Sequence, residues 1–234
     1  MEKFAAIVLA AGSGRRMGST IQKQYLSLAG KPVLYYSLKA FEESSVDYVI
    51  LVTGAGEEAY CRKEIIERYG ITKVTGIVPG GKERYHSVFA GLRAAAGADY
   101  VLIHDGARPL VSEDIILRSM ETVRQCKACV VGMPVKDTIK VVDKDHVAVD
   151  TPNRKSLWQV QTPQTFSYDL IYHAYQKILQ QENETITDDA MVFDMVTGQN
   201  VKVIEGSYRN IKITTPEDMM IAEMYLKQTL EAED

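Results

Sequence analysis

Short apolar runs rich in β-branched residues recur along the chain, and between them apolar residues follow a helical spacing. The runs that predict strands are Phe4–Leu9, Tyr48–Val52, Val74–Val78, Tyr100–His104 and Ala128–Gly132. The intervening stretches that predict helices are Glu57–Tyr69, Ser87–Ala96 and Ser112–Cys126. This alternation predicts an α/β fold with a mostly parallel sheet covered by helices on both faces. Ligands bind such sheets outside the carboxyl ends of the strands, so residues that follow a strand are the first site candidates.

One segment, residues 134–158, interrupts the alternation. Thr138–Val142 and His146–Asp150 have the pattern of two strands joined by a polar turn. A hairpin of this size is not stable alone, so it either packs on its own chain or reaches a partner. Both interpretations are open; a projecting arm in a symmetric homodimer is the preferred one.

After the hairpin the pattern returns to helices. Those predicted are Tyr168–Gln181, Asp188–Thr197 and Pro216–Leu230, with a strand over Val201–Glu205. Thr215 and Pro216 are typical of a helix start, Thr as the cap and Pro in the first helical position.

Composition narrows the class of protein. With 234 residues, 46% of them hydrophobic and 25% charged, the chain is expected to form one globular domain, residues 1–234, with 134–158 as an arm insertion. The net charge of -4 provides no basic field for nucleic acid, which is not an expected partner. No apolar run approaches the ~20 residues of a membrane span. The few cysteines and the absence of a signal-peptide pattern predict a cytoplasmic location.

The first candidate site is the loop AAGSGRRMG, residues 10–18, which follows the first strand. Its glycines let backbone N–H groups approach phosphates, and Arg16 with Lys23 can neutralise a triphosphate. A dinucleotide fingerprint is excluded because Met17 stands where glycine is required, and a Walker loop because Ser19 stands where lysine is required. An ordinary glycine turn with solvated arginines remains an alternative.

Two further loops follow predicted strands. Gly80 and Gly81 expose backbone groups that can read the edge of a base, and Ser87 can add a side-chain contact; a solvated turn with a helix cap is the alternative. Asp105 suits a metal, ribose or substrate hydroxyls, and Arg108 suits phosphate, although the two residues also fit a local ion pair.

The remaining candidates are scattered and individually weak: KDT at 136–138, Arg154, TPQ at 162–164, TDD at 187–189 and NIK at 210–212. Thr187 fits a simple helix cap equally well, and Lys212 a surface charge.

Taken in order, these blocks resemble the 2-C-methyl-D-erythritol 4-phosphate cytidylyltransferase family over nearly the whole chain. The matching blocks are AAGSGRRM with KQYL, GGKERYHS, HDGARP, PVKDTIK, LWQVQTPQTF, TITDDA and NIKITTPEDM. The resemblance implies a Rossmann-like nucleotidyltransferase fold and a homodimer with interlocking β-arms. It implies transfer of CMP from CTP to the polyol phosphate in isoprenoid precursor biosynthesis by the non-mevalonate pathway. Mg²⁺ would be held mainly by the triphosphate rather than by protein ligands.

The resemblance also implies roles for individual residues. The residues implied to be catalytic are Arg16, Lys23 and Lys212. Those implied to bind CTP are Ala10, Ala11, Gly12, Gly14, Gly80, Gly81, Arg84, Ser87, Asp105 and Ala107. Those implied to bind the polyol phosphate are Arg108, Thr138, Arg154, Thr187 and Lys212, with Thr138 and Arg154 supplied by the partner's arm.

Two alternatives stay open. The ribitol-5-phosphate cytidylyltransferases share most blocks and the chemistry, but the loop at 10–12 and the TITDD block look more like the methylerythritol enzymes. A noncatalytic nucleotide-binding protein would be expected to lack one of the three catalytic cations, and all three are present.

Overall fold

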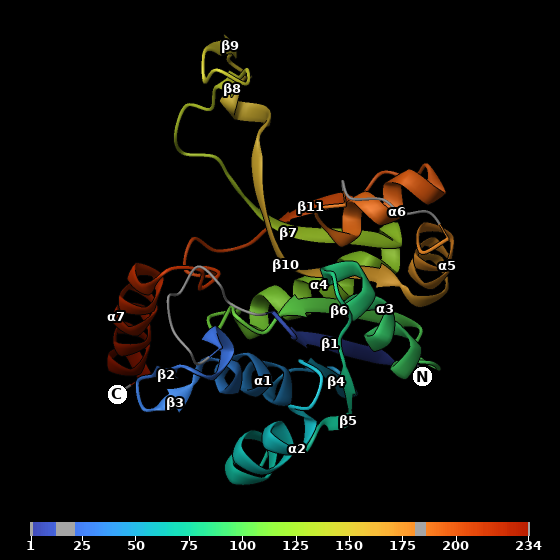
Figure 1. Ribbon diagram of the computed structural model, residues 1–234, viewed down its shortest axis with the longest axis vertical. Helices are drawn as coiled ribbons and strands as arrows, with labels where there is room; N and C mark the ends of the chain where they lie inside the picture. Colours follow the sequence, from blue (N-terminus) through green and yellow to red (C-terminus); the bar gives the residue numbers. More distant parts are fainter. Residues whose placement is uncertain (1, 13–21, 181–185, 234) are drawn as a thin grey trace.

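A computed structural model describes residues 2–12, 22–180 and 186–233. In these residues the central sheet has seven strands in the order β11-β7-β10-β6-β1-β4-β5 (Figure 1). Their bounds are β1 Phe4–Ala10, β4 Tyr48–Thr53, β5 Val74–Pro79, β6 Tyr100–Asp105, β7 Ala128–Pro134, β10 Trp158–Ser167 and β11 Lys202–Glu205. Neighbouring strands are parallel except where β10 pairs with β6 and β7. The predicted α/β class and the mostly parallel sheet are confirmed.

Helices cover both faces of the sheet. One face carries α1 (Val33–Glu43), α2 (Glu58–Cys61) with the π-helix Arg62–Glu67, and α4 (Glu113–Cys126). The other face carries α3 (Arg84–Ala94), α5 (Tyr168–Ile178) and α6 (Asp189–Thr197). Successive side chains of a strand point to opposite faces, so Ala6 and Val8 of β1 join the first core and Ile7 joins the second.

A smaller cluster attaches the last helix. The helix α7 (Pro216–Glu233) packs beside the short strand β2 (Ser27–Leu28), which pairs with β3 (Lys31–Pro32). Leu28, Ile213 and Ala222 are buried there. In the described residues no helix is long and apolar enough to cross a membrane.

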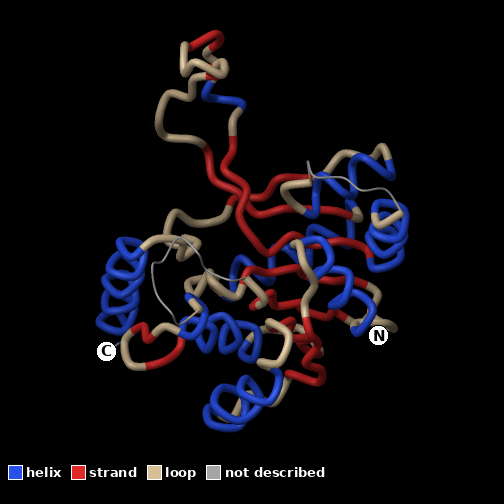
Figure 2. The backbone as a smooth tube through the Cα atoms, in the orientation of Figure 1, coloured by secondary structure: helices blue, strands red, loops and turns tan. Residues whose placement is uncertain are grey.

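The interruption at residues 134–158 is a projecting arm. Its tip is a separate two-stranded sheet of β8 (Val141–Val142) and β9 (Ala148–Asp150), followed by a 3₁₀ turn at Arg154–Ser156. The arm stands well away from the body (Figure 1, Figure 2). Its tip valines are exposed, Val147 by 58% and Val149 by 60%. The structure therefore supports the projecting hairpin over one folded on the body.

The structure differs from the sequence prediction in several elements. No helix is predicted over α1 and no strand over β10, although both are present. The helix α3 begins at Arg84 rather than Ser87. The backbone N–H of Glu83 bonds to Nδ1 of His86, so the helix is capped one turn earlier than predicted. The cap of α6 is Asp188, not Thr187, because its carboxylate accepts the Met191 N–H at 3.0 Å.

Candidate active site

A cavity of about 420 Å³ lies at the carboxyl ends of β1 and β6. Leu9 of β1 is in register with Asp105 of β6, so the loops that follow these two strands meet there. After β1 the chain adds β4 and β5 on one side of β1 and then β6 on its other side. Open α/β sheets bind their ligands at the point where the strand order reverses in this way. The described lining residues are Leu9, Ala10, Ala11, Gly12, Lys23, Gln24, Gly81, Lys82, Glu83, Arg84, Ser87, Asp105, Ala107 and Lys212.

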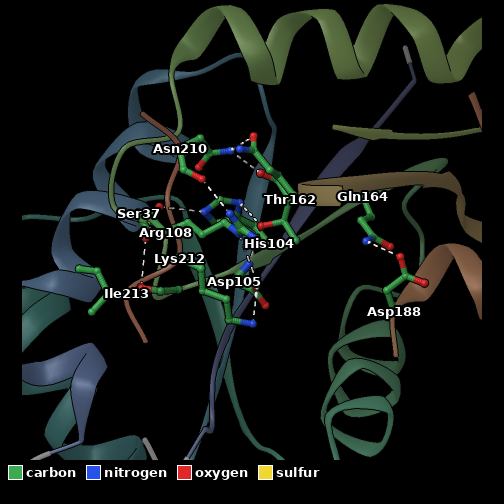
Figure 3. Close-up of polar contacts among 12 residues, drawn as sticks. Ser37, His104, Asp105, Arg108, Thr162, Gln164, Asp188, Asn210, Lys212 and Ile213 are labelled. Atoms are coloured by element: carbon green, nitrogen blue, oxygen red, sulfur yellow. Dashed lines mark hydrogen bonds and ion pairs between the residues drawn. The ribbon is translucent and has the colours of Figure 1, made fainter. Parts of the chain in front are cut away.

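The carboxylate of Asp105 is surrounded by cations (Figure 3). Its Oδ2 lies 2.9 Å from Lys212 Nζ and 3.5 Å from Arg108 Nε, and its Oδ1 lies 3.9 Å from Arg84 Nε. Burial alone would raise the pKa of Asp105, but the charges of Lys212, Arg84 and Arg108 outweigh burial and hold the pKa well below its usual range. Asp105 is therefore an anion that orients Lys212, Arg84 and Arg108.

A buried histidine fixes the turn after β6. The Nδ1 of His104 lies 3.0 Å from Thr162 Oγ1, and its Nε2 lies 3.2 Å from the Arg108 carbonyl oxygen. Burial lowers the pKa of His104 to about 4, so the ring is neutral near pH 7. The carbonyl can only accept, so Nε2 carries the proton and Nδ1 accepts from the Thr162 hydroxyl. That hydroxyl also accepts the backbone N–H of Asp105 at 3.1 Å, so both ends of the turn are held.

The segment that carries Lys212 is tied to the same turn (Figure 3). Arg108 Nη1 donates to the Asn210 carbonyl at 2.7 Å, and the Ile213 N–H donates to the Ala107 carbonyl at 2.8 Å. Lys23 Nζ donates to the Ile213 carbonyl at 2.9 Å. The two predicted catalytic lysines, far apart in sequence, therefore come together at one edge of the cavity.

A second ion pair joins the opposite wall. Arg84 Nη1 and Nη2 lie 2.6 and 2.7 Å from the two carboxylate oxygens of Asp189. Asp189 is 0% exposed and also accepts from the Tyr175 hydroxyl. Gln164 Oε1 accepts the N–H groups of Asp189 and Ala190. This network joins the start of α3 to the start of α6.

Gly80 permits a close contact between two loops. A Cβ at this position would lie 2.5 Å from Ala11 Cβ and 2.7 Å from Ser87 Oγ. The Gly81 N–H donates to Ser87 Oγ at 3.1 Å. The glycine pair therefore brings the loop after β1 against the first turn of α3.

The structure brings most of the predicted residues together. Those that line the cavity are Ala10, Ala11, Gly12, Lys23, Gly81, Arg84, Ser87, Asp105, Ala107 and Lys212. Gly80 and Arg108 are not among the lining residues; Gly80 lies against Ala11 and Ser87, and the buried Arg108 bonds to Asn210 and Asp105. The predicted roles of Arg16 and Gly14 fall outside the described residues.

Three of the five predicted acceptor residues lie elsewhere. Thr187 is exposed just before α6, with its hydroxyl 3.8 Å from Met191 Sδ. Thr138 and Arg154 are exposed on the arm, where Arg154 Nη1 donates to the Lys136 carbonyl at 2.8 Å. Within one chain these three residues do not line the cavity.

Three polar lining residues have no predicted role. Gln24 is buried, and its Nε2 donates to the carbonyls of Ala10 at 2.6 Å and Gly12 at 3.2 Å. Lys82 and Glu83 also border the cavity. Their signal in the sequence is that they adjoin Lys23 and the glycine pair and fall within the matching blocks KQYL and GGKERYHS.

The described residues do not form a metal cage. Among them, no group of three or more His, Cys, Asp or Glu side chains could hold an ion. The Asp105 carboxylate faces Lys212, Arg108 and Arg84. A divalent cation carried by the triphosphate, as the resemblance implies, needs no such cage.

The fold and this cation-lined cavity define a nucleotide-binding α/β protein. The family model for 2-C-methyl-D-erythritol 4-phosphate cytidylyltransferase (IspD) matches residues 4–228, and the chain belongs to this family. The enzyme of that name from Lachnospira eligens is 54% identical over 224 residues, which cover 95% of this chain and 98% of the relative. The Alkaliphilus oremlandii enzyme is 49% identical, covering 97% and 96%.

Solved structures agree with this assignment. The 4-diphosphocytidyl-2C-methyl-D-erythritol synthase of Anaerococcus prevotii superposes with a TM-score of 0.85 at 36% identity, covering 97% of this chain and 96% of that chain. The 2-C-methyl-D-erythritol 4-phosphate cytidylyltransferase of Thermus thermophilus gives a TM-score of 0.77 at 28% identity, covering 94% and 98%. The resemblance found in the sequence is confirmed, and the chain is a nucleotidyltransferase.

Proposed function

We propose that the protein transfers CMP from CTP to 2-C-methyl-D-erythritol 4-phosphate, giving 4-diphosphocytidyl-2-C-methyl-D-erythritol and pyrophosphate. The observation that carries this proposal is family membership over residues 4–228. The cavity supports it, because Lys23, Lys212 and Arg84 border one space large enough for a nucleotide.

The reaction is an in-line displacement. An oxygen of the acceptor phosphate forms a bond to the α-phosphorus of CTP, and the bond from that phosphorus to the β-phosphate oxygen breaks. A phosphate dianion is already a nucleophile, so no general base is required. The protein's task is to position two mutually repelling anions and to neutralise their charge.

Each group of described residues has a part in this task. Lys23 and Lys212 would stabilise charge on the phosphates, together with Arg16, which lies outside the described residues. Asp105 orients Lys212 through the 2.9 Å ion pair and would lie by the ribose. The loop after β1 and the glycine pair would hold cytosine. Mg²⁺ bound by the triphosphate would supply further positive charge.

The acceptor site is completed by a second subunit in this proposal. Arg108 and Thr187 would bind the polyol phosphate together with Lys212, and the partner's arm would bring Thr138 and Arg154. The exposed valines of the arm support a homodimer, because exposed apolar side chains on a projection are typical of an interface. The cytoplasmic location stays a prediction.

The test offers the purified protein each nucleoside triphosphate with either 2-C-methyl-D-erythritol 4-phosphate or ribitol 5-phosphate. Pyrophosphate release and product mass are measured. We expect product with CTP and the methylerythritol acceptor. Product from ribitol 5-phosphate alone would contradict the acceptor assignment, and CTP binding without turnover would favour the noncatalytic alternative.

A further inference from the structure

Glu57, which directly precedes α2, holds the chain segment that carries Lys23. Its Oε2 accepts the Tyr25 hydroxyl at 2.7 Å and the Gly54 N–H at 3.1 Å. Its Oε1 accepts the side-chain amide of Gln22. Gln22 and Tyr25 flank Lys23, so one carboxylate binds the chain on both sides of that lysine.

The residues between these two anchors reach the cavity. Lys23 Nζ donates to the Ile213 carbonyl at 2.9 Å, beside Lys212. Gln24 lines the cavity and donates to the carbonyls of Ala10 and Gly12. The 3₁₀ turn Lys23–Tyr25 is too short to stabilise itself, so these side-chain contacts contribute to fixing the position of Lys23.

The fit around the Glu57 carboxylate is close. A Cβ added at Gly54 would lie 2.7 Å from Glu57 Oε2, so glycine is required for the carboxylate to come this near the backbone. Burial raises the pKa of Tyr25 far above its usual value, so its hydroxyl stays protonated and donates. Glu57 itself does not line the cavity.

We propose that Glu57 is a positioning residue for cytidylyl transfer, acting through Lys23. The inference rests on the proposed function, in which Lys23 stabilises the reacting phosphates. A displacement of about 1 Å at a catalytic group can cost about a hundredfold in rate. The loss of Glu57 would release both sides of the Lys23 turn at once.

The first test compares Glu57→Ala with Glu57→Gln. We expect Glu57→Ala to lower kcat at least about tenfold while the KM for CTP changes less, because the Lys23 contact strengthens in the transition state. Glu57→Gln keeps the shape and an acceptor oxygen, so it should recover most of kcat. Unchanged kcat in folded Glu57→Ala would overturn the proposal.

Glu42 provides a matched control. Its carboxylate accepts from the backbone N–H groups of Thr72 and Lys73 at 2.8–3.0 Å and from the Thr72 hydroxyl, away from the cavity. Glu42→Ala should lower the free energy of unfolding without lowering kcat. If Glu42→Ala lowers kcat as much as Glu57→Ala, the effect is general destabilisation and the proposal is wrong.

A double-variant cycle tests the route through Lys23. In the Lys23→Ala background, Glu57→Ala should remove little further activity, because the group it positions is gone. Losses that multiply in the double variant would overturn the proposal.

If Glu57→Ala does not fold, Tyr25→Phe and Gly54→Ala replace it, and both should lower kcat with CTP binding retained. If the wild-type protein is inactive, the proposed function itself is wrong. This outcome is distinct from failure of the Glu57 proposal, in which the wild type is active.

Discussion

The ammonium group of Lys212 lies 2.9 Å from Oδ2 of Asp105, although the helices α4, α5 and α6 and the arm lie between the two residues in the chain. The Asp105 side chain is 11% exposed and that of Lys212 is 36% exposed. The carboxylate of the pair is therefore largely buried, whereas the lysine is accessible to a ligand.

Lys212→Met separates activity from stability. We expect cytidylyltransferase activity to fall at least about a hundredfold, the scale of one lost transition-state contact. The free energy of unfolding should change by only about 1 kcal/mol, because Lys212 is partly exposed and Asp105 keeps Arg84 and Arg108. Urea titration and initial rates measure both quantities. Lys227→Met, an exposed control on α7, should change neither.

Lys23→Ala is expected to lose activity by a similar factor of at least about a hundred. Its physical reason is the loss of positive charge at the reacting phosphates. The measurement is pyrophosphate release by protein whose circular dichroism matches the wild type. Lys39→Ala, which removes only an exposed pair with Glu43, is the control. Near wild-type turnover in folded Lys23→Ala would refute the assignment of Lys23.

His104 makes stability depend on pH. Burial lowers its pKa from 6.5 to about 4, so below pH 6.5 the unfolded chain binds a proton that the folded chain excludes. The free energy of unfolding should therefore fall by about 2 kcal/mol between pH 7 and pH 5, and this contribution stops changing below about pH 4. Asp105 does not titrate in this window because its pKa lies well below the usual range.

Urea denaturation at pH 7 and pH 5 measures this dependence. His104→Gln should be less stable at pH 7, having lost bonds to Thr162 and Arg108, but should lose less on acidification. The exposed His173→Gln should behave like the wild type. Equal pH dependence in wild type and His104→Gln would contradict the assignment.

The arm prediction concerns assembly. Val147→Asp and Val149→Asp would place a carboxylate in the proposed apolar interface, which is costly to bury, so the dimer should dissociate. Sedimentation velocity measures the change, and Lys144→Glu in the polar turn is the control. A wild-type protein that is monomeric at assay concentrations would rule out the proposed dimer.

Arg154 gives a second test of the arm. If it acts in the partner's site, mixing inactive Arg154→Ala and Lys23→Ala proteins should restore about a quarter of the wild-type rate, because half the dimers are mixed and each holds one intact site. No recovery after subunit exchange would place Arg154 in its own chain's site or outside any site.

The sequence predicts β1, β4, β6 and β7 well because these strands are buried on both faces and read as apolar runs. The strand β10 is different, since Gln161, Thr162 and Gln164 are buried within it. Their partners include Asn210 and the start of α6, which no local pattern can indicate. A polar strand in a sheet centre therefore escapes prediction from hydrophobicity.

The residues of the candidate site also differ in how well the sequence predicts their positions. Asp105 and Gly12 follow predicted strands, so their place beside a ligand can be expected from the fold class alone. The contacts of Glu57 with Tyr25 and of Arg84 with Asp189 join distant segments and exist only once the chain is folded. By the hydrophobic pattern alone, Glu57 and Asp189 cannot be distinguished from surface charges, and Arg84 is singled out only by the family resemblance.

Pro134 of β7 and Trp158 of β10 are paired across the sheet, so the chain leaves the body and returns to it at one point. Insertions, deletions or substitutions in the arm beyond this residue pair leave the strands beneath the cavity unchanged. Apart from Thr138 and Arg154, the surface that we assign to subunit recognition can thus diversify in evolution while the sheet beneath the cavity stays the same.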